Sequence, residues 1–318
     1  MIQDETPKRE LLVTERNVLA EGVVELVLAD ASGGDLPPWE PGAHIVLLLD
    51  GGLVRQYSLC GDPQETKSWR VAVLREPDSR GGSRWIHEAL QLGQMLEAQD
   101  PRNNFSLEPA QEHLLVAGGI GITPLLTMVR ELDRRGADWK LLYGGRKSVS
   151  MAYLDALAQY GSRVTVRPED EHGLLDISAF LGVPREGVGV YACGPERLLD
   201  AVEIQTRSWP DGTLHVERFK PRPGALEGIS TPFEVILSRS GKSITVGASE
   251  TIIEALDRIG LHVPRSCGEG TCGTCLTKVL DGVPDHRDSF LIGRKRKQNK
   301  AMCVCCSRAL TPKITLDL

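Results

Sequence analysis

Four cysteines near the C-terminus carry the clearest chemical signal in the chain. Cys267, Cys272 and Cys275 have the spacing C-x4-C-x2-C, and further cysteines follow after a long gap. This spacing is typical of a plant-type [2Fe–2S] cluster, which is held by four cysteine thiolates. Such a cluster takes up one electron at a time and breaks no bonds by itself. The rest of the chain is therefore expected to deliver electrons to it.

The fourth thiolate is ambiguous on spacing alone, because Cys303, Cys305 and Cys306 lie together. The loop that carries the first three cysteines also holds glycines that tolerate unusual dihedral angles and leave N–H groups free to point at sulfur, namely Gly268, Gly270 and Gly273. The alternative is a structural zinc site, although its usual spacing is two C-x2-C pairs.

A second signal is the glycine-rich turn Gly118–Pro124, which follows the apolar run Leu114–Ala117. Glycines let the backbone approach a pyrophosphate, and the N-terminus of the following helix attracts negative charge. We expect Thr123 to be the N-cap and Pro124 the first residue of that helix. Since Pro124 stands where the third glycine of G-x-G-x-x-G would be, a tight turn without a ligand is the alternative.

Cys193-Gly194-Pro195 ends a later apolar strand, Val188–Ala192. In an open α/β sheet, ligands bind at the carboxyl ends of the strands. A thiol there could contact a flat ring, although a buried strand-end cysteine without a ligand is the alternative.

A third signal is Arg55-Gln56-Tyr57-Ser58, which lies in a predicted strand. An arginine can hold a phosphate through two hydrogen bonds, a tyrosine can stack on a flavin ring, and a serine can bond the polar edge of that ring. Arg80-Gly81-Gly82-Ser83, with Ser83 as the expected N-cap of a short helix, would add a second phosphate contact. The alternative is an ordinary strand aromatic beside a surface charge.

The elements that must position these residues fall into three predicted domains and a linker. Residues 1–110 contain β-rich runs separated by turns, typical of an antiparallel barrel, with one helix near 84–92. In residues 111–220 strands alternate with helices, which predicts a parallel sheet. Residues 221–230 are rich in Pro and Gly and form the expected linker, and 231–318 begin with a hairpin.

Individual elements are predicted within these domains. Expected barrel strands are 11–13, 23–28, 44–47 and 70–74. In the α/β domain the expected strands are 114–117, 140–143, 163–166 and 188–192, and the expected helices are 124–135, 151–160 and 196–207. The last domain should hold a hairpin of 233–237 and 243–246, then a helix over 249–259 with Ser249 as N-cap.

Composition restricts the protein class. The charged N-terminus does not resemble a secretion signal, and the longest apolar stretch, Leu114–Val129, is interrupted by glycines and a proline. Eight cysteines without such a signal favour a reducing compartment and metal or redox roles. We therefore expect a cytoplasmic, monomeric protein that binds neither membrane nor nucleic acid.

Charge is unevenly distributed along the chain. Residues from Thr231 onward carry 13 Lys or Arg against 9 Asp or Glu, whereas the preceding chain carries 24 against 34. A cationic module beside an acidic body is compatible with an acidic docking partner. A solvated basic loop over Arg294–Lys297 is the alternative.

Together these motifs resemble the phthalate dioxygenase reductase family, which includes the vanillate demethylase reductases. The segments that carry the resemblance are RQYSLCGDP (55–63), RGGS (80–83), AGGIGITPLL (117–126), YACGPE (191–196), SCGEGTCGTC (266–275), DHRD (285–288) and CCSRA (305–309). They cover nearly the whole chain. The resemblance implies a multidomain fold: an antiparallel β-barrel flavin domain, a ferredoxin-reductase-like α/β nicotinamide domain and an α+β plant-type ferredoxin domain.

The resemblance also implies FMN, NADH and a [2Fe–2S] cluster, and it assigns site residues. It assigns FMN binding to Arg55, Tyr57, Ser58, Gly82 and Ser83, with Thr123 near the flavin. It assigns binding of the nicotinamide nucleotide to Gly119, Gly121, Thr123, Arg146 and Cys193. Further cofactor-binding positions are Gln56, Ala72, Leu74, Arg80, Gly81, Pro124, Gly194 and Phe219. Catalytic roles go to Cys193, Ser58 and Thr123, and the cluster ligands are Cys267, Cys272, Cys275 and Cys305. The family's closing C-V-S-R-A reads C-C-S-R-A here.

The implied activity is electron transfer from NADH through FMN to the cluster and on to a separate terminal oxygenase, of Rieske type. A flavin is needed because a nicotinamide gives up two electrons and the cluster accepts one. Transfer from a cluster near about −400 mV to a Rieske centre at roughly −150 to +300 mV is downhill. The chain has no C-x-H pair for a Rieske centre of its own. A cytochrome P450 or other haem acceptor, and a non-catalytic metal-bearing interaction protein, are the alternatives. Arg146 and Lys147 could bind the 2′-phosphate of NADPH, so NADPH is the alternative to NADH as electron donor.

Overall fold

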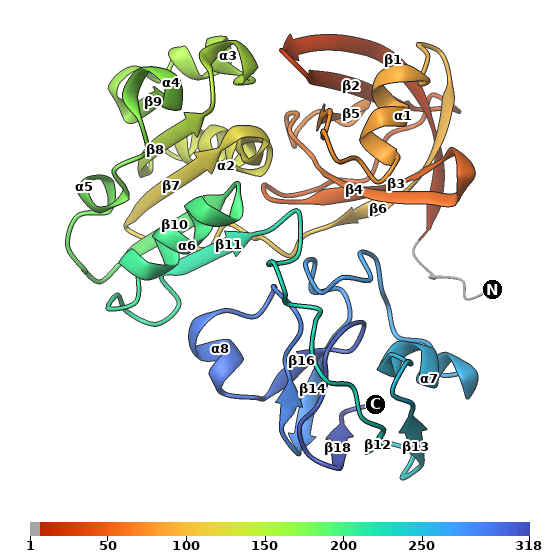
Figure 1. Ribbon diagram of the computed structural model, residues 1–318. Helices are drawn as coiled ribbons and strands as arrows, with labels where there is room; N and C mark the ends of the chain where they lie inside the picture. The colour runs from red at the N-terminus through yellow and green to blue at the C-terminus, as the bar shows by residue number, and fades with distance from the viewer. Residues whose placement is uncertain (1–6) are drawn as a thin grey trace. The chain divides into compact units, whose positions relative to one another are not determined.

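The computed structural model describes residues 7–318, which form two compact units (Figure 1). The first unit contains the described residues up to Val216, and the second runs from Glu217 to Leu318. Within the described residues, no helix has the length and apolar character needed to cross a membrane.

The first unit begins with an antiparallel barrel. Its strands are β1 (Lys8–Ala20), β2 (Val23–Asp30), β3 (His44–Leu49), β4 (Leu53–Ser58), β5 (Ser68–Leu74) and β6 (Met95–Arg102), in the order β4-β3-β6-β1-β2-β5. A bridge between Leu59 and Val71 joins the two outermost strands and closes the barrel. Period-two alternation turns Val24, Leu26 and Leu28 of β2 into the barrel core, and the residues between them are buried on the other face of the strand. Helix α1 (Gly82–Glu88) and the 3-10 turn η1 (Asp50–Gly52) complete it.

The same unit continues with a parallel sheet. Its strands are β7 (Glu112–Gly118), β8 (Asp138–Gly145), β9 (Val164–Pro168), β10 (Val188–Cys193) and β11 (Leu214–Glu217), in the order β11-β10-β7-β8-β9. Neighbouring strands from β10 to β9 run parallel. The helices are α2 (Ile122–Arg134), α3 (Leu154–Ala158), α4 (Glu169–His172), α5 (Ile177–Leu181) and α6 (Glu196–Gln205), with 3-10 turns η2 (Gly119–Gly121), η3 (Ser148–Ser150) and η4 (Gly161–Arg163).

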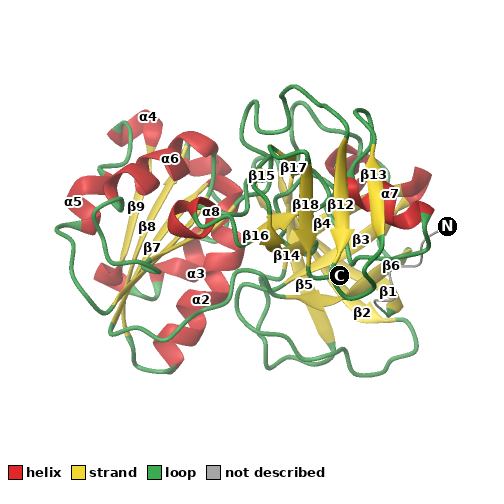
Figure 2. Ribbon diagram, turned by 90° about the horizontal axis from the view of Figure 1, so that it is seen from below, coloured by secondary structure: helices red, strands yellow, loops and turns green. Residues whose placement is uncertain are grey.

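Helices cover both faces of this sheet, as Figure 2 shows. Leu115 and Ala117 of β7 pack in one apolar cluster with α2, whereas Leu114 and Val116 pack in another with α5 and α6. A strand buried on both faces reads as a continuous apolar run, which is the pattern that the sequence shows here.

The second unit holds a mixed sheet. Its elements are β12 (Phe233–Leu237), β13 (Ser243–Val246), α7 (Ile252–Arg258), β14 (Leu276–Asp281), β15 (Pro284–Asp285), α8 (Gly293–Lys297), β16 (Ala301–Cys303), β17 (Arg308–Ala309) and β18 (Lys313–Leu316). The sheet order is β13-β12-β18-β14-β16, and β15 pairs with β17. The predicted hairpin is present, with Phe233 opposite Val246. The three-part fold class expected from the sequence is confirmed.

Residues 218–230 contain no helix or strand, but side chains of the second unit hold them in place. Arg287 donates to the hydroxyl of Ser230 at 3.0 Å and to the carbonyl oxygen of Ile229 at 2.9 Å. The hydroxyl of Ser289 accepts the backbone N–H of Arg222 at 2.8 Å. These contacts near both ends of the segment hold it against the rest of the second unit.

The helix starts differ from those predicted. The N-cap of α2 is Gly121 rather than Thr123, because the 3-10 turn η2 leads directly into the helix. Thr123 lies in the first turn of α2, and its hydroxyl donates to the carbonyl oxygen of Ile120 at 3.0 Å. The N-cap of α1 is Gly81 rather than Ser83.

The start of α7 was also predicted wrongly. Its N-cap is Thr251 rather than Ser249, because Thr251 and Glu254 form a reciprocal capping box. The N-cap therefore lies two residues later than expected, and the helix begins at Ile252.

Candidate functional site

The glycine-rich loop after β7 and the Cys-Gly-Pro loop after β10 are packed against each other. A β-carbon on Gly121 would lie 2.3 Å from the carbonyl oxygen of Cys193, and one on Gly194 would lie 2.9 Å from the Cα of Gly118. The strands that end in these loops pair in parallel, with Ala117 opposite Cys193. Two motifs about 70 residues apart thus meet at the carboxyl edge of one sheet, where ligands bind in this kind of fold.

The open side of this edge suits a dinucleotide phosphate. Gly119 has φ of 54° and no atom within 4 Å of the position of a β-carbon, so the backbone there is accessible. The N–H groups at the start of the 13-residue helix α2 follow directly, with Thr123 and Pro124 in its first turn. These groups fit a pyrophosphate.

Arg146 and Cys193 belong to the same edge but differ in exposure. Arg146 follows β8 and is exposed, and its carbonyl oxygen accepts the N–H of Asp170 at 3.2 Å. The side chain of Cys193 is completely buried. A nicotinamide ring would reach that thiol only if neighbouring groups moved.

The predicted flavin residues of β4 lie beside the first turn of α1. The guanidinium of Arg55 donates to the carbonyl oxygen of Arg80, and a β-carbon on Gly82 would lie 2.6 Å from the Cγ of Arg55. Gly81 has φ of 95°, which favours glycine. Glycine at position 82 lets the side chain of Arg55 lie against this turn. The Arg55 guanidinium then lies beside backbone N–H groups, an arrangement that fits a phosphate.

Other predicted flavin residues have structural contacts of their own. Tyr57 is half-buried against the barrel core, and burial raises the pKa of its hydroxyl. The hydroxyl of Ser83 donates to Ser79 at 2.9 Å and accepts the N–H of Glu76 at 3.2 Å, so it fastens the preceding loop. Ser58 is buried.

Three more predicted positions lie away from this turn. Ala72 and Leu74 are on the outer face of β5, in the apolar contact between the barrel and the α/β half. Phe219, 43% exposed, belongs to the second unit, whereas all other predicted flavin and nucleotide residues belong to the first.

The predicted cluster ligands come together in the second unit. Thiol contacts join Cys267 to Cys272 and Cys305, and Cys275 to Cys305. The sulfur of Cys267 accepts the backbone N–H of Glu269 at 3.3 Å and of Thr271 at 3.4 Å. Hydrogen bonds from Cys272 and Cys305, together with these N–H groups, lower the pKa of Cys267 despite its burial. A thiolate, the form that binds iron, is favoured there.

The contacts among these thiols point to Cys305 rather than Cys303 as the fourth member of the group. In residues 7–318, no group of three or more His, Cys, Asp or Glu side chains is arranged to hold a single metal ion. A [2Fe–2S] cluster spreads its four ligands over two irons, two to each. Cys305 touches both Cys267 and Cys275, whereas Cys303 touches Cys275. The donor set therefore fits a cluster with Cys305 as its fourth ligand.

The segment 286–290 supports the cysteine loop from behind. A β-carbon on Gly270 would lie 2.8 Å from the Cα of Asp288, and one on Gly273 would lie 2.4 Å from the ring of Phe290. The N–H of Ser289 donates to the carbonyl oxygen of Gly270 at 2.9 Å. Both glycines have positive φ, so the loop conformation and this close packing both require glycine.

Several contacts at the site were not predicted. Arg130 of α2 donates to the carbonyl oxygens of Cys60 at 2.7 Å and Gly61 at 2.9 Å, which attaches α2 to the residues that follow β4. In the sequence Arg130 is one charge among many on an amphipathic helix, so no local signal reveals this contact.

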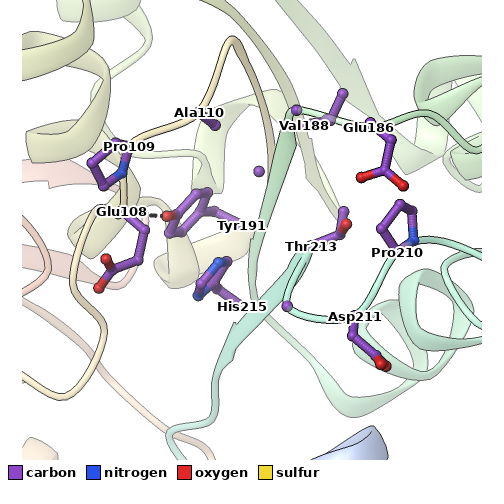
Figure 3. Close-up of a pocket in the computed structure, with 13 residues that line it drawn as sticks. Glu108, Pro109, Ala110, Glu186, Val188, Tyr191, Pro210, Asp211, Thr213 and His215 are labelled. Carbon is purple, nitrogen blue, oxygen red and sulfur yellow. Dashed lines mark hydrogen bonds between the residues drawn. The ribbon is translucent and has the colours of Figure 1, made fainter.

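A shallow cavity elsewhere in the α/β half is lined by none of the predicted residues. It lies where β10 begins, at Val188 and Gly189, opposite the end that carries Cys193. Figure 3 shows the ring of Tyr191 beside that of His215; the two stack with centroids 4.5 Å apart. The predicted nucleotide residues lie at the other end of the strand.

Comparison with known proteins agrees with this geometry. Residues 235–310 match the family model of the 2Fe-2S iron-sulfur cluster binding domain. Vanillate O-demethylase oxidoreductase from Pseudomonas sp. is 39% identical over 97% of this chain and 99% of its own length. Phthalate dioxygenase reductase from Burkholderia cepacia is 38% identical over 97% of both chains. The chain belongs to the phthalate dioxygenase reductase family. The family resemblance noted in the sequence is confirmed, and the chain is an oxidoreductase.

Solved structures extend the comparison. The structure titled phthalate dioxygenase reductase, a modular structure for electron transfer from pyridine nucleotides to [2Fe-2S], is 36% identical, covers 99% of this chain and 98% of its own, and has a TM-score of 0.70. An intact type IV self-sufficient cytochrome P450 monooxygenase is 43% identical over 98% of this chain, with a TM-score of 0.87. This chain spans 41% of the length of that P450 protein. The phthalate dioxygenase reductase fold thus occurs both alone and as part of a longer chain.

Proposed function

We propose that the protein is the NADH-dependent reductase component of a multicomponent oxygenase, with FMN and a [2Fe–2S] cluster as resident cofactors. When bound, these groups convert the two-electron hydride of NADH into single electrons for an acceptor protein. The observation that carries the proposal is the packing of Gly121 on Cys193, which joins two nucleotide-type loops at one sheet edge, in the same chain as a four-thiol cluster loop.

The chain's residues would divide the work between binding and orientation. Arg55, with the first turn of α1 at Gly82, would hold the flavin phosphate. Gly119 and the start of α2 would hold the nucleotide pyrophosphate, and Thr123 would lie between nucleotide and flavin. Cys267, Cys272, Cys275 and Cys305 would hold the cluster, with N–H groups on Cys267 sulfur tuning its potential.

The electron acceptor is proposed to be a separate terminal oxygenase of Rieske type. Support comes from the relatives named vanillate O-demethylase oxidoreductase and phthalate dioxygenase reductase. A haem acceptor is the second candidate, because this chain also matches part of a self-sufficient P450 and, at 40% identity over 294 residues, the heme-dependent oxidative N-demethylase beta subunit from Ectopseudomonas mendocina. The first is favoured by full-length relatives named as a phthalate dioxygenase reductase and as a reductase subunit of a toluene-4-sulfonate monooxygenase system. A monomer located in the cytoplasm is part of the same proposal.

Anaerobic reduction of the purified holoprotein by NADH tests the function. The absorption spectrum should show flavin and iron–sulfur bands, extraction should release FMN, and NADH should bleach both chromophores. NADPH should act more slowly, because the first turn of α4, which carries the acidic residues Glu169, Asp170 and Glu171, contacts the backbone of Arg146 and brings negative charge near this edge. A protein that NADH leaves oxidised would refute the proposal. Reconstitution with a purified Rieske oxygenase and with a P450 would then separate the two acceptors.

A further inference from the structure

A buried polar network joins the α/β half of the first unit to the barrel. Its central residue is Tyr153, just before α3. The Tyr153 hydroxyl donates to a carboxylate oxygen of Glu25 at 3.0 Å and lies 3.1 Å from the sulfur of Cys60. Glu25 is only 7% exposed and Cys60 only 1%. None of the three residues stands out in the sequence as a site residue.

Each polar group of this network has a hydrogen-bond partner. The second carboxylate oxygen of Glu25 accepts from the guanidinium of Arg70 at 3.0 Å. The thiol of Cys60 lies 3.3 Å from the carbonyl oxygen of Arg70, and burial raises the pKa of that thiol to about 12, so it stays a neutral donor. A buried network whose members are all paired fixes one arrangement of the parts that it joins.

The backbone at Tyr153 is held in an unfavourable conformation. Its φ of 65° and ψ of 20° lie in the left-handed region, which residues with a β-carbon rarely adopt. Such a conformation persists only where the surroundings enforce it, and it is concentrated at functional sites. Here the anchored hydroxyl and the packing of the ring supply that enforcement.

The position of the network gives it a role. Ile120, from the glycine-rich nucleotide loop, packs with Tyr153 against Ala72 on the outer wall of the barrel. Cys60 follows the predicted flavin residue Ser58 by two positions, and its carbonyl oxygen is held by Arg130 of the nucleotide helix. The network therefore lies where the nucleotide loop and the end of the flavin strand meet.

We infer that Tyr153 is a positioning residue for hydride transfer from NADH, because its hydroxyl, held by Glu25 and Cys60, fixes the nucleotide loop relative to strand β4. This inference rests on the proposed function and names residues that the proposal does not use. Reactions of this kind depend steeply on geometry, since a shift of about 1 Å can cost about a hundredfold in rate.

The test is Tyr153→Phe in the holoprotein, which removes the hydroxyl and keeps the ring. Stopped-flow reduction by NADH should be slowed by about tenfold to a hundredfold at saturating NADH, with little change in the NADH dissociation constant. Hydrogen exchange should rise in residues 19–25, 58–61 and 149–153 and stay unchanged in 231–318. Tyr160→Phe is the matched control, because Tyr160 packs edge-on against Trp139 in the same half and should alter neither measurement.

The outcomes separate a positioning role from a merely structural one. Faster exchange with an unchanged rate at saturating NADH would overturn the inference, as would an unchanged exchange pattern. If Tyr153→Phe does not fold, Cys60→Ala provides the same two measurements and the same criteria. If NADH fails to reduce even the wild-type protein, the proposed function fails, whereas the exchange measurement still tests the link between the two halves.

Discussion

The carbonyl oxygen of Cys193 occupies the space where a side chain on residue 121 would begin, since a β-carbon on Gly121 would lie 2.3 Å away from it. Cys193 is the last residue of β10, and Gly121 lies in the short turn η2 between β7 and α2, so neither backbone can move without disturbing the elements beside it. Gly121 has φ of −62°, which any residue can adopt, so the requirement for glycine here comes from contact alone.

Gly121→Ala should therefore separate the two nucleotide loops. We expect a loss of stability of about 1–3 kcal/mol from overpacking and a clear rise in KM for NADH. Thermal unfolding and steady-state kinetics would measure both. Gly34→Ala, in an exposed turn where the nearest atom lies 3.5 Å from the added carbon, is the control. An alanine at 121 with unchanged KM would contradict the assignment of this edge to the nucleotide.

Arg55→Ala should weaken flavin binding. A charge-assisted hydrogen bond contributes about 1.5–3 kcal/mol, so the dissociation constant should rise by roughly ten- to a hundredfold. Arg55→Lys should restore only part of the affinity, because lysine lacks the two-pronged geometry. Flavin content after gel filtration and fluorescence titration of the flavin-depleted protein would measure the change. Arg84→Ala, which removes an exposed arginine of the neighbouring helix α1, should leave flavin content unchanged.

Cys305→Ser should abolish the normal cluster, whereas Cys303→Ser and Cys306→Ser should keep it. The reason is that the thiol of Cys305 touches both Cys267 and Cys275. Iron and sulfide analysis and the electron paramagnetic resonance spectrum of the reduced protein would decide. A wild-type spectrum from Cys305→Ser, with loss in Cys303→Ser, would move the fourth ligand to Cys303.

Asp288 should make the second unit sensitive to acid. Burial alone would raise the pKa of Asp288, but hydrogen bonds with His286 and from the N–H of Leu291, and the charge of Arg296, lower it overall below 3.8. A depressed carboxyl pKa contributes stability above the unfolded value, and that contribution disappears as pH falls through the folded value. Loss of cluster absorbance during thermal unfolding should therefore become easier below about pH 4.

Substitution isolates this carboxylate. Asp288→Ala should cost about 3–5 kcal/mol, because it leaves buried partners unpaired, and should remove the acid dependence. Asp281→Ala, an exposed carboxylate of the same unit, should change neither quantity. Equal acid sensitivity in wild type and Asp288→Ala would assign the effect to other groups.

Local chemistry made much of the fold predictable. The turn before α2, the hairpin of β12 and β13 and the cysteine loop each depend on residues close in sequence, and all three are present. The predicted N-caps Thr123, Ser83 and Ser249 were wrong because preceding turns and a competing capping box decided where the helices begin. No strong local sequence pattern marked four other elements, so the sequence did not predict strands β6 and β11 or helices α4 and α5.

Contacts between residues far apart in the chain could not be predicted from one sequence. Glu25 and Tyr153 are 128 residues apart, and Arg130 reaches Cys60 across 70. Each of these residues has an ordinary sequence neighbourhood, and only the packing of one half on the other gives them partners. The left-handed conformation at position 153 could not be predicted either, because the residue there is a tyrosine and not a glycine or asparagine.

The attachment of residues 222–230 to the second unit by Arg287 and Ser289 affects delivery of electrons within the proposed reductase. A fully flexible chain of these nine residues would have a root-mean-square end-to-end distance of roughly 17 Å, and a chain that is held along its length explores less space. A short tether corresponds to an effective concentration on the order of millimolar. Electron exchange between the two units should therefore be independent of dilution, whereas cleavage of the tether would make it a second-order reaction between separate molecules.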